Sequence, residues 1–157
     1  MSDAYLWIKW VHVVSATILF GTGLGTALHM WLVHLSGDIR AIALVARNTV
    51  RIDWLFTATS GVIQLVSGVA LIFIVGYDPW ALWLVTSYVL YGIAGLCWLP
   101  VVWLQIRIRD MAALATERGE ALPAAYDRYM RIWFVLGWPA FFAVLAAMAV
   151  MVAKPNL

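Results

Sequence analysis

The chain has 157 residues, of which 65% are hydrophobic and 11% charged, and its mean hydropathy is +0.92. Soluble domains carry about 25% charged residues, so this composition excludes a water-soluble domain and indicates a small protein that crosses a membrane several times. A net charge of +2 gives no reason to expect nucleic-acid binding. The single cysteine, Cys97, excludes an intrachain disulfide and a cysteine-based metal site.

Four apolar stretches are long enough to cross a bilayer, whose hydrocarbon core of about 30 Å needs about 20 helical residues. They cover about residues 5–35, 54–75, 80–104 and 132–152. The alternating strands of a membrane barrel are missing, and helices are the other structure that satisfies its own backbone in lipid. The sequence therefore predicts an all-α, four-helix membrane bundle in which residues 1–157 form a single domain.

The segment between the first two spans has its own helical pattern. Ser36 or Asp38 can cap a helix start, and Ile42, Ala46 and Val50 recur at helical spacing. We interpret the segment as a surface helix, with a lipid-headgroup or phosphate site as the alternative. The opposite face of this helix carries its basic residues: Arg40, Arg47 and Arg51.

The segment between the last two spans is also predicted to be helical. The third helix is expected to continue to Arg118 and to stop at Gly119, which suits a left-handed cap, while Pro123 suits the first turn of the next helix. These two loops hold all eight arginines, whereas Lys9 and Lys154 lie on the other side. By the positive-inside rule both loops face the cytoplasm and both termini face outward.

Tryptophan supports the same orientation, because its ring prefers the membrane interface. We expect one group at the outer interface and a second group at the inner one. The outer group is Trp7, Trp10, Trp80 and Trp83, and the inner group is Trp31, Trp54, Trp103 and Trp133.

The first span carries a polar stripe. Six residues follow a 3-4-3-4-3 spacing, which places them along one seam of a packed helix, so this face is predicted to contact protein. Gly21 and Gly25 form a GxxxG step that lets another backbone or a flat ligand approach. The six residues of the seam are His12, Ser15, Leu19, Thr22, Thr26 and His29.

His12 is the strongest candidate for chemistry, because an ionisable side chain inside a span is a functional hypothesis by default. It could be an axial ligand of haem iron, with Lys9 meeting the propionates, or a histidine satisfied by a neighbouring helix, or a proton relay. His29 is a weaker ligand candidate. About 25 Å of helix separates it from His12, so the two cannot bind one metal ion. Gln64, near the centre of the second span, is expected to form an interhelical hydrogen bond.

The opening run YLWIKWVH, Tyr5 to His12, resembles the first helix of HemJ-type protoporphyrinogen IX oxidases, which are small haem-b membrane proteins. The resemblance implies that His12 is an axial ligand and that Lys9 is the matched lysine. The family's second histidine motif has no counterpart in residues 80–104, which contain no histidine. Two alternatives follow for the second axial ligand. The iron has none and is five-coordinate, or a symmetric dimer supplies a second His12.

Most of the chain resembles the domain of unknown function 2269 family of bacterial four-helix membrane proteins. The motifs that carry this resemblance are LFGTGLGTA, GDIRAIALVAR, DWLFT, LCWLPVVWLQIR and RIWFVLGWPAF. That family is distantly similar to HemJ and to CopD-type copper-resistance proteins, so the resemblance implies haem or copper chemistry and a multi-pass protein of the bacterial inner membrane.

The leading hypothesis is therefore a haem-b-binding membrane protein, an oxidoreductase or electron carrier, with His12 on the iron and a homodimer or small homo-oligomer as its expected assembly. Two alternatives stay open: a non-enzymatic accessory subunit of a larger membrane complex, and a copper-handling protein. The sequence leaves undecided whether the protein is an enzyme.

Overall fold

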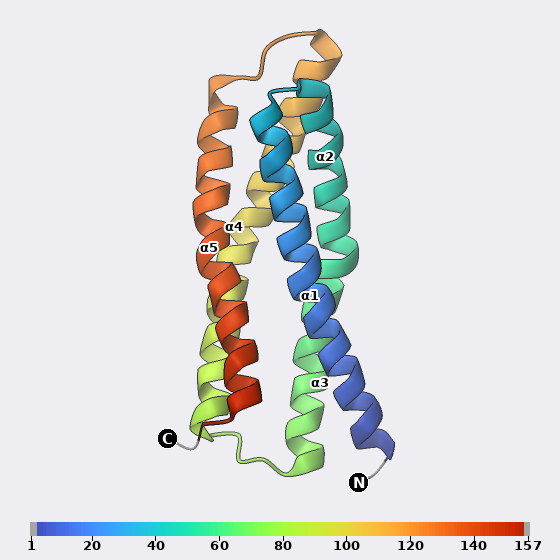
Figure 1. Cartoon of the computed structure of the whole chain (residues 1–157), viewed down its shortest axis with the longest axis vertical. Coiled ribbons are helices and arrows are strands. Elements are labelled where there is room, and N and C mark those ends of the chain that lie inside the picture. Colours follow the sequence, from blue (N-terminus) through green and yellow to red (C-terminus); the bar gives the residue numbers. More distant parts are fainter. Residues whose placement is uncertain (1–2, 156–157) are drawn as a thin grey trace.

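The computed structural model describes residues 3–155, all of whose regular structure is helical. Four helical segments are long and apolar enough to cross a membrane: Asp3–Ser36, Ile39–Val75, Leu82–Arg118 and Ala124–Ala153. They form one elongated bundle with both termini at the same end (Figure 1). The predicted all-α class with four membrane-length helices is confirmed, whereas the side of the membrane on which the termini lie stays a prediction.

The first segment is α1 (Asp3–Ser36), and the second is a continuous rod made of α2 (Ile39–Ile52), the π-helical turn η1 (Asp53–Ala58) and α3 (Thr59–Val75). Of the two predicted caps, Ser36 and Asp38, Asp38 is the N-cap of α2: its carboxylate accepts hydrogen bonds from the backbone N–H groups of Arg40 and Ala41. The predicted surface helix therefore leads without a break into the second span.

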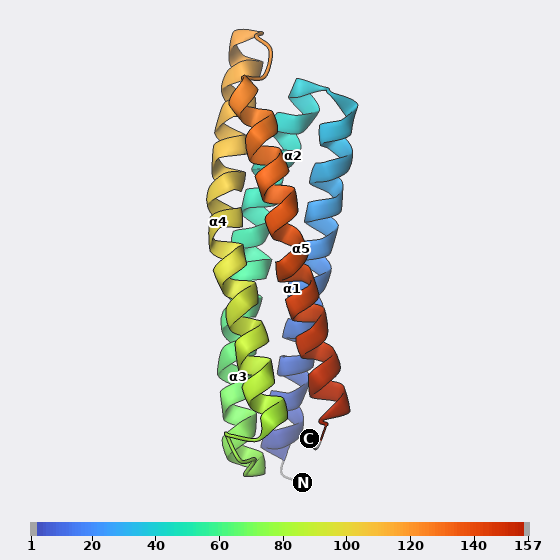
Figure 2. The same cartoon turned by 90° about the vertical axis from the view of Figure 1, so that its left-hand side faces the viewer.

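The third and fourth segments are α4 (Leu82–Arg118) and α5 (Ala124–Ala153). As predicted, α4 runs to Arg118 and ends on Gly119, whose φ of +65° is left-handed. The connection has no helix of its own, and Pro123 lies at the N-cap of α5, one residue before the first turn. At 37 residues, α4 spans about 55 Å, and the α4–α5 hairpin extends beyond α1 and α2 (Figure 2).

We call the end of the bundle that contains α2 the α2 end, and the end with both termini and the α3–α4 loop the terminal end. The hydrophobic core lies at the α2 end, where α1, α2, α4 and α5 meet. Tyr126 closes this core from α5, and its hydroxyl lies 3.2 Å from Nδ1 of His34 on α1. The core residues are Met30, Ile42, Val45, Ala46, Val101, Leu104, Ile108, Ala112, Tyr126, Met130 and Trp133.

Towards the terminal end the helices associate as two pairs, α1 with α3 and α4 with α5, and these pairs diverge (Figure 1). One bridge between them is the Tyr91 hydroxyl of α4, which donates to the Gly61 carbonyl of α3 at 2.6 Å. Trp54 and Trp103 are exposed, and their place at a membrane interface stays a prediction. The interface prediction is wrong for Trp133, which is buried in the core.

Candidate functional site

A cavity of about 530 Å³ lies at mid-height in the bundle, between the α2-end core and the divergent helix pairs. All four membrane-length segments contribute to its wall, which is mostly apolar and aromatic. Phe20 of α1, Trp98 of α4 and Phe141 of α5 are among the lining residues. A space of this size and character is typical of a site for a small lipophilic molecule.

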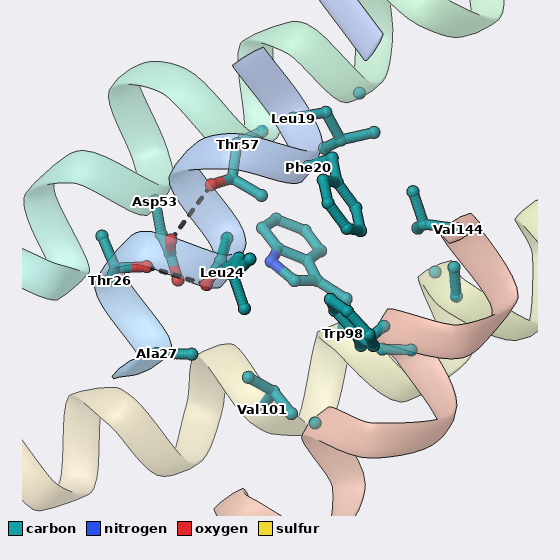
Figure 3. A pocket seen from close by; sticks show the side chains of 18 of the residues that line it. Leu19, Phe20, Leu24, Thr26, Ala27, Asp53, Thr57, Trp98, Val101 and Val144 are labelled. Carbon is teal, nitrogen blue, oxygen red and sulfur yellow. Dashed lines mark hydrogen bonds between the residues drawn. The ribbon is translucent and has the colours of Figure 1, made fainter. Parts of the chain in front are cut away.

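One buried carboxyl group lies in this wall. Asp53 is 4% exposed and begins the π-helical turn η1. The Thr57 hydroxyl, one turn later, donates to its Oδ1 at 3.0 Å, and the side chains of Thr26 and Gln105 lie beside the same carboxyl group. Figure 3 shows Asp53, Thr26 and Thr57 facing one another, with Trp98 and Val144 across the cavity.

The buried carboxyl group lies at the start of a π-helical turn. Such turns are rare overall but frequent at functional sites. The turn covers Asp53–Ala58, and within it Asp53 and Thr57 are buried while the intervening Trp54, Leu55 and Phe56 are exposed.

Three buried polar atoms lack a hydrogen-bond partner among residues 3–155: Nε1 of Trp98, Nε1 of Trp133 and Oε1 of Gln105. All three residues line the cavity. An unpaired buried polar atom costs about 1–3 kcal/mol. The residues of the cavity wall thus include two indole N–H donors and one amide acceptor without a partner, together with one carboxyl group.

His12 lies outside this cavity, on the α1–α3 contact nearer the terminal end. Its Nε2 is 2.9 Å from Nε2 of Gln64, which can only donate, so His12 Nε2 accepts. Its Nδ1 is 2.9 Å from the Ser67 hydroxyl. Ser67 donates its own proton to the Ile63 carbonyl at 2.6 Å, and therefore Nδ1 of His12 donates.

Ser15 completes this network by donating to Oε1 of Gln64 at 2.6 Å. The interhelical role predicted for Gln64 is therefore confirmed. A Cβ at Gly68 would lie 3.2 Å from Cε1 of His12, so the imidazole packs directly on the backbone of α3. Of the alternatives for His12, this geometry corresponds to a histidine satisfied by a neighbouring helix.

The residues around His12 do not fit a haem group. An axial bond needs a free imidazole lone pair, but the lone pair on Nε2 accepts from Gln64 and Nδ1 carries the proton. Lys9 is exposed and its Nζ lies over the Tyr5 ring, 5.5 Å from the centroid. Haem ligation by His12 stays a prediction from the resemblance, and it would require His12 to leave its partners on α3.

The other predicted ligand-binding residues are not brought together. His29 is exposed in the single chain, so the expectation that the whole seam of α1 contacts protein stays a prediction at this position. Gly21 and Gly25 are also exposed, and a Cβ at either would meet no atom within 4 Å. Their small-residue face is directed away from the other helices, and a homodimer built on it stays a prediction.

The sequence interpretation missed Asp53 and Gln105, and it assigned Trp98 and Trp133 no ligand role. One signal was available, since Asp53 is a lone acidic residue directly before a 22-residue apolar span. Nothing in the sequence indicated that Gln105 and the two indoles would face the same space. Within residues 3–155, no group of three or more His, Cys, Asp or Glu side chains is placed to hold a metal ion.

The comparison with known proteins gives one match. The family model described as a predicted integral membrane protein, DUF2269, matches residues 6–155. No curated protein and no solved structure matches the chain. The match covers nearly the whole sequence and agrees with four helices of membrane length. The chain belongs to the DUF2269 family of predicted integral membrane proteins.

Proposed function

We propose that this protein binds a lipophilic small molecule inside its bundle, with the apolar body of the ligand in the central cavity and an oxygen-bearing head beside Asp53. The observation that carries the proposal is the coincidence of three unpaired buried polar atoms, on Trp98, Trp133 and Gln105, with one cavity of about 530 Å³. A ligand that pairs these atoms removes their desolvation cost, which gives it an advantage over a lipid tail.

The polar groups define the head of this ligand. Each indole N–H can only donate, so the head needs acceptors such as carbonyl, ether or quinone oxygens. The free Oε1 of Gln105 and the carboxyl group of Asp53 favour a hydroxyl on the same head. Aromatic walls at Phe20, Trp98 and Phe141 suit a flat ring. Oxygenated ring compounds with an apolar tail meet these conditions: an isoprenoid quinone supplies the acceptor oxygens, and its reduced quinol supplies hydroxyl groups as well.

Two glycines of α4 give a matched test of this proposal. Gly95 lines the cavity and Gly92 does not, and a Cβ at either position would meet nothing within 4 Å. Gly95→Leu therefore adds a side chain at the cavity wall whose Cβ meets no other atom, whereas Gly92→Leu adds the same side chain outside the cavity lining. Each variant and the wild type are purified in mild detergent, their bound lipids are extracted and identified by mass spectrometry, and thermal unfolding is followed with and without decylubiquinone.

We expect a small molecule to co-purify with the wild type and with Gly92→Leu and to be reduced at least fivefold in Gly95→Leu. We also expect decylubiquinone to raise the unfolding temperature of the first two proteins only. Trp98→Phe removes one free N–H and should weaken the binding of decylubiquinone, whereas Trp103→Phe, on the exposed face of α4, should leave this binding unchanged. Equal lipid content and equal response to the probe in Gly95→Leu and Gly92→Leu would refute the proposal.

The same preparation tests the haem hypothesis. Haem bound through His12 would give a Soret band that His12→Ala removes, and its absence after haem supplementation would reject that hypothesis without affecting the cavity proposal. The accessory-subunit and copper alternatives have no structural observation in their favour and stay predictions.

A further inference from the structure

A second hollow, of about 540 Å³, lies between α2 and the part of α4 that packs against it, on a different face of the bundle from the central cavity. Four arginines contribute to its lining, three from α2 and one from α4. Small side chains at Ala43 and Ala113 form part of the wall between the two helices, which leaves room for long side chains to meet. The arginines are Arg40, Arg47, Arg51 and Arg109.

The amphipathic character of α2 places its arginines in this hollow. Its apolar face, which includes Ile42, Val45 and Ala46, is buried in the α2-end core, so the basic face is fixed in orientation. Arg47 and Arg51 are one helical turn apart, and both side chains are exposed. The core packing thus holds the arginine row of α2 beside α4.

The charges in this hollow are not balanced within the protein. Arg109 forms an ion pair with Asp110 at 2.7 Å, and Glu117 is the one acidic residue in the lining. Within residues 3–155, Arg40, Arg47 and Arg51 form neither an ion pair nor a side-chain hydrogen bond of their guanidinium groups. At least two positive charges therefore remain uncompensated in a concave site.

We propose that this hollow binds a phosphate group, which the planar fork of arginine recognises through paired, charge-assisted hydrogen bonds. The positive-inside rule accounts for arginines on this side of the membrane but not for their convergence from two helices. Arg118 and Arg131 also lie at the α2 end of the bundle but do not line the hollow. The site is separate from the central cavity and does not depend on its ligand.

A phospholipid headgroup is the expected source of this phosphate. Two exposed tryptophans lie near lining arginines in the sequence, Trp54 three residues after Arg51 and Trp103 six residues before Arg109, and are of the kind that marks a membrane interface. Arginines close to an anionic membrane surface attract acidic lipids, and a headgroup with an exposed phosphate monoester presents the most oxygens to the four guanidinium groups.

The test compares two double variants of the full-length protein that each remove two positive charges. Arg47→Gln/Arg51→Gln alters the hollow, and Arg118→Gln/Arg131→Gln is the control outside it. All four residues are exposed, so both variants should fold, which their unfolding temperature in detergent alone verifies. The change in unfolding temperature is then measured with dioleoyl phosphatidic acid, with dioleoyl phosphatidylcholine and with inorganic phosphate.

We expect phosphatidic acid to stabilise the wild type and the control variant equally and to bind Arg47→Gln/Arg51→Gln roughly tenfold more weakly, with little effect of phosphatidylcholine on any of them. If inorganic phosphate reproduces the whole pattern, the site takes free phosphate and the proposal still holds. Equal losses in the two double variants would mean a diffuse effect of net charge and would overturn the proposal, as would equal stabilisation by the two lipids.

Discussion

At the α2 end, apolar side chains from α1, α2, α4 and α5 are almost fully buried against one another, and Ile108 and Ala112 have no exposed surface. Towards the terminal end the buried residues are mainly serines, with Ser15, Ser67 and Ser87 each under 10% exposed, and the helices form two pairs. Close packing therefore holds the first end together, whereas at the second end interhelical hydrogen bonds join α1 to α3. The central cavity lies where one mode gives way to the other.

This difference follows from the solvent. In lipid, burying an apolar side chain gains nothing from the exclusion of water, so association relies on van der Waals contact and interhelical hydrogen bonds. The α2 end places an extra amphipathic helix against α4 and obtains dense packing. The terminal end lacks such a helix, and a few polar residues on α1 and α3 provide the contact instead. The stability that the α2-end core provides can offset the free-energy cost of the unpaired polar atoms at the cavity.

The largest effect is expected from a cavity made in the α2-end core. Ile108→Ala removes a side chain with 0% exposure, and we expect a loss of about 2–5 kcal/mol in the free energy of unfolding, because the surrounding core cannot collapse around the void. Leu65→Ala is the control: Leu65 lines the existing cavity and is 56% exposed. Unfolding in a denaturing detergent measures both. Equal losses would mean that the two regions are packed alike.

A smaller effect is expected at the polar contact between α1 and α3. His12→Ala leaves the Gln64 amide and the Ser67 hydroxyl without their imidazole partner, and at about 0.6 kcal/mol for each interhelical bond we expect a loss of about 1 kcal/mol. His29→Ala, on an exposed position of the same helix, should change stability by less than about 0.3 kcal/mol. A His12→Ala protein as stable as the wild type would show that this network does not hold the pair.

The smallest effect is expected at the bridge between the helix pairs. Tyr91→Phe removes the hydroxyl that donates to the Gly61 carbonyl, and one interhelical hydrogen bond in a membrane protein averages about 0.6 kcal/mol. Tyr88→Phe, on the same helix but exposed, is the matched control. Hydrogen exchange at α3 amides should increase in Tyr91→Phe alone. An unchanged exchange rate would mean that other contacts keep α3 and α4 in register.

Much of the architecture was predictable from local patterns. Hydropathy identified the four long helices, Asp38 and Gly119 marked helix ends correctly, and the spacing of Ile42, Ala46 and Val50 identified the buried face of α2. These features depend on the chain within a few residues, so the sequence displays them directly. The same locality explains the failure at Trp133, because which side of a helix meets a neighbour depends on helices that are distant in the sequence.

The sequence by itself determined a four-helix membrane protein with an arginine-rich amphipathic helix and an interhelical role for Gln64. Only the tertiary structure decided where the candidate chemistry lies. Both ring nitrogens of His12 form hydrogen bonds with side chains of α3, and Asp53, Gln105, Trp98 and Trp133 line one cavity. The physical reason is that whether a polar atom finds a hydrogen-bond partner depends on its neighbours in space. Residues 53, 98, 105 and 133 become neighbours only because three separate helical segments pack together.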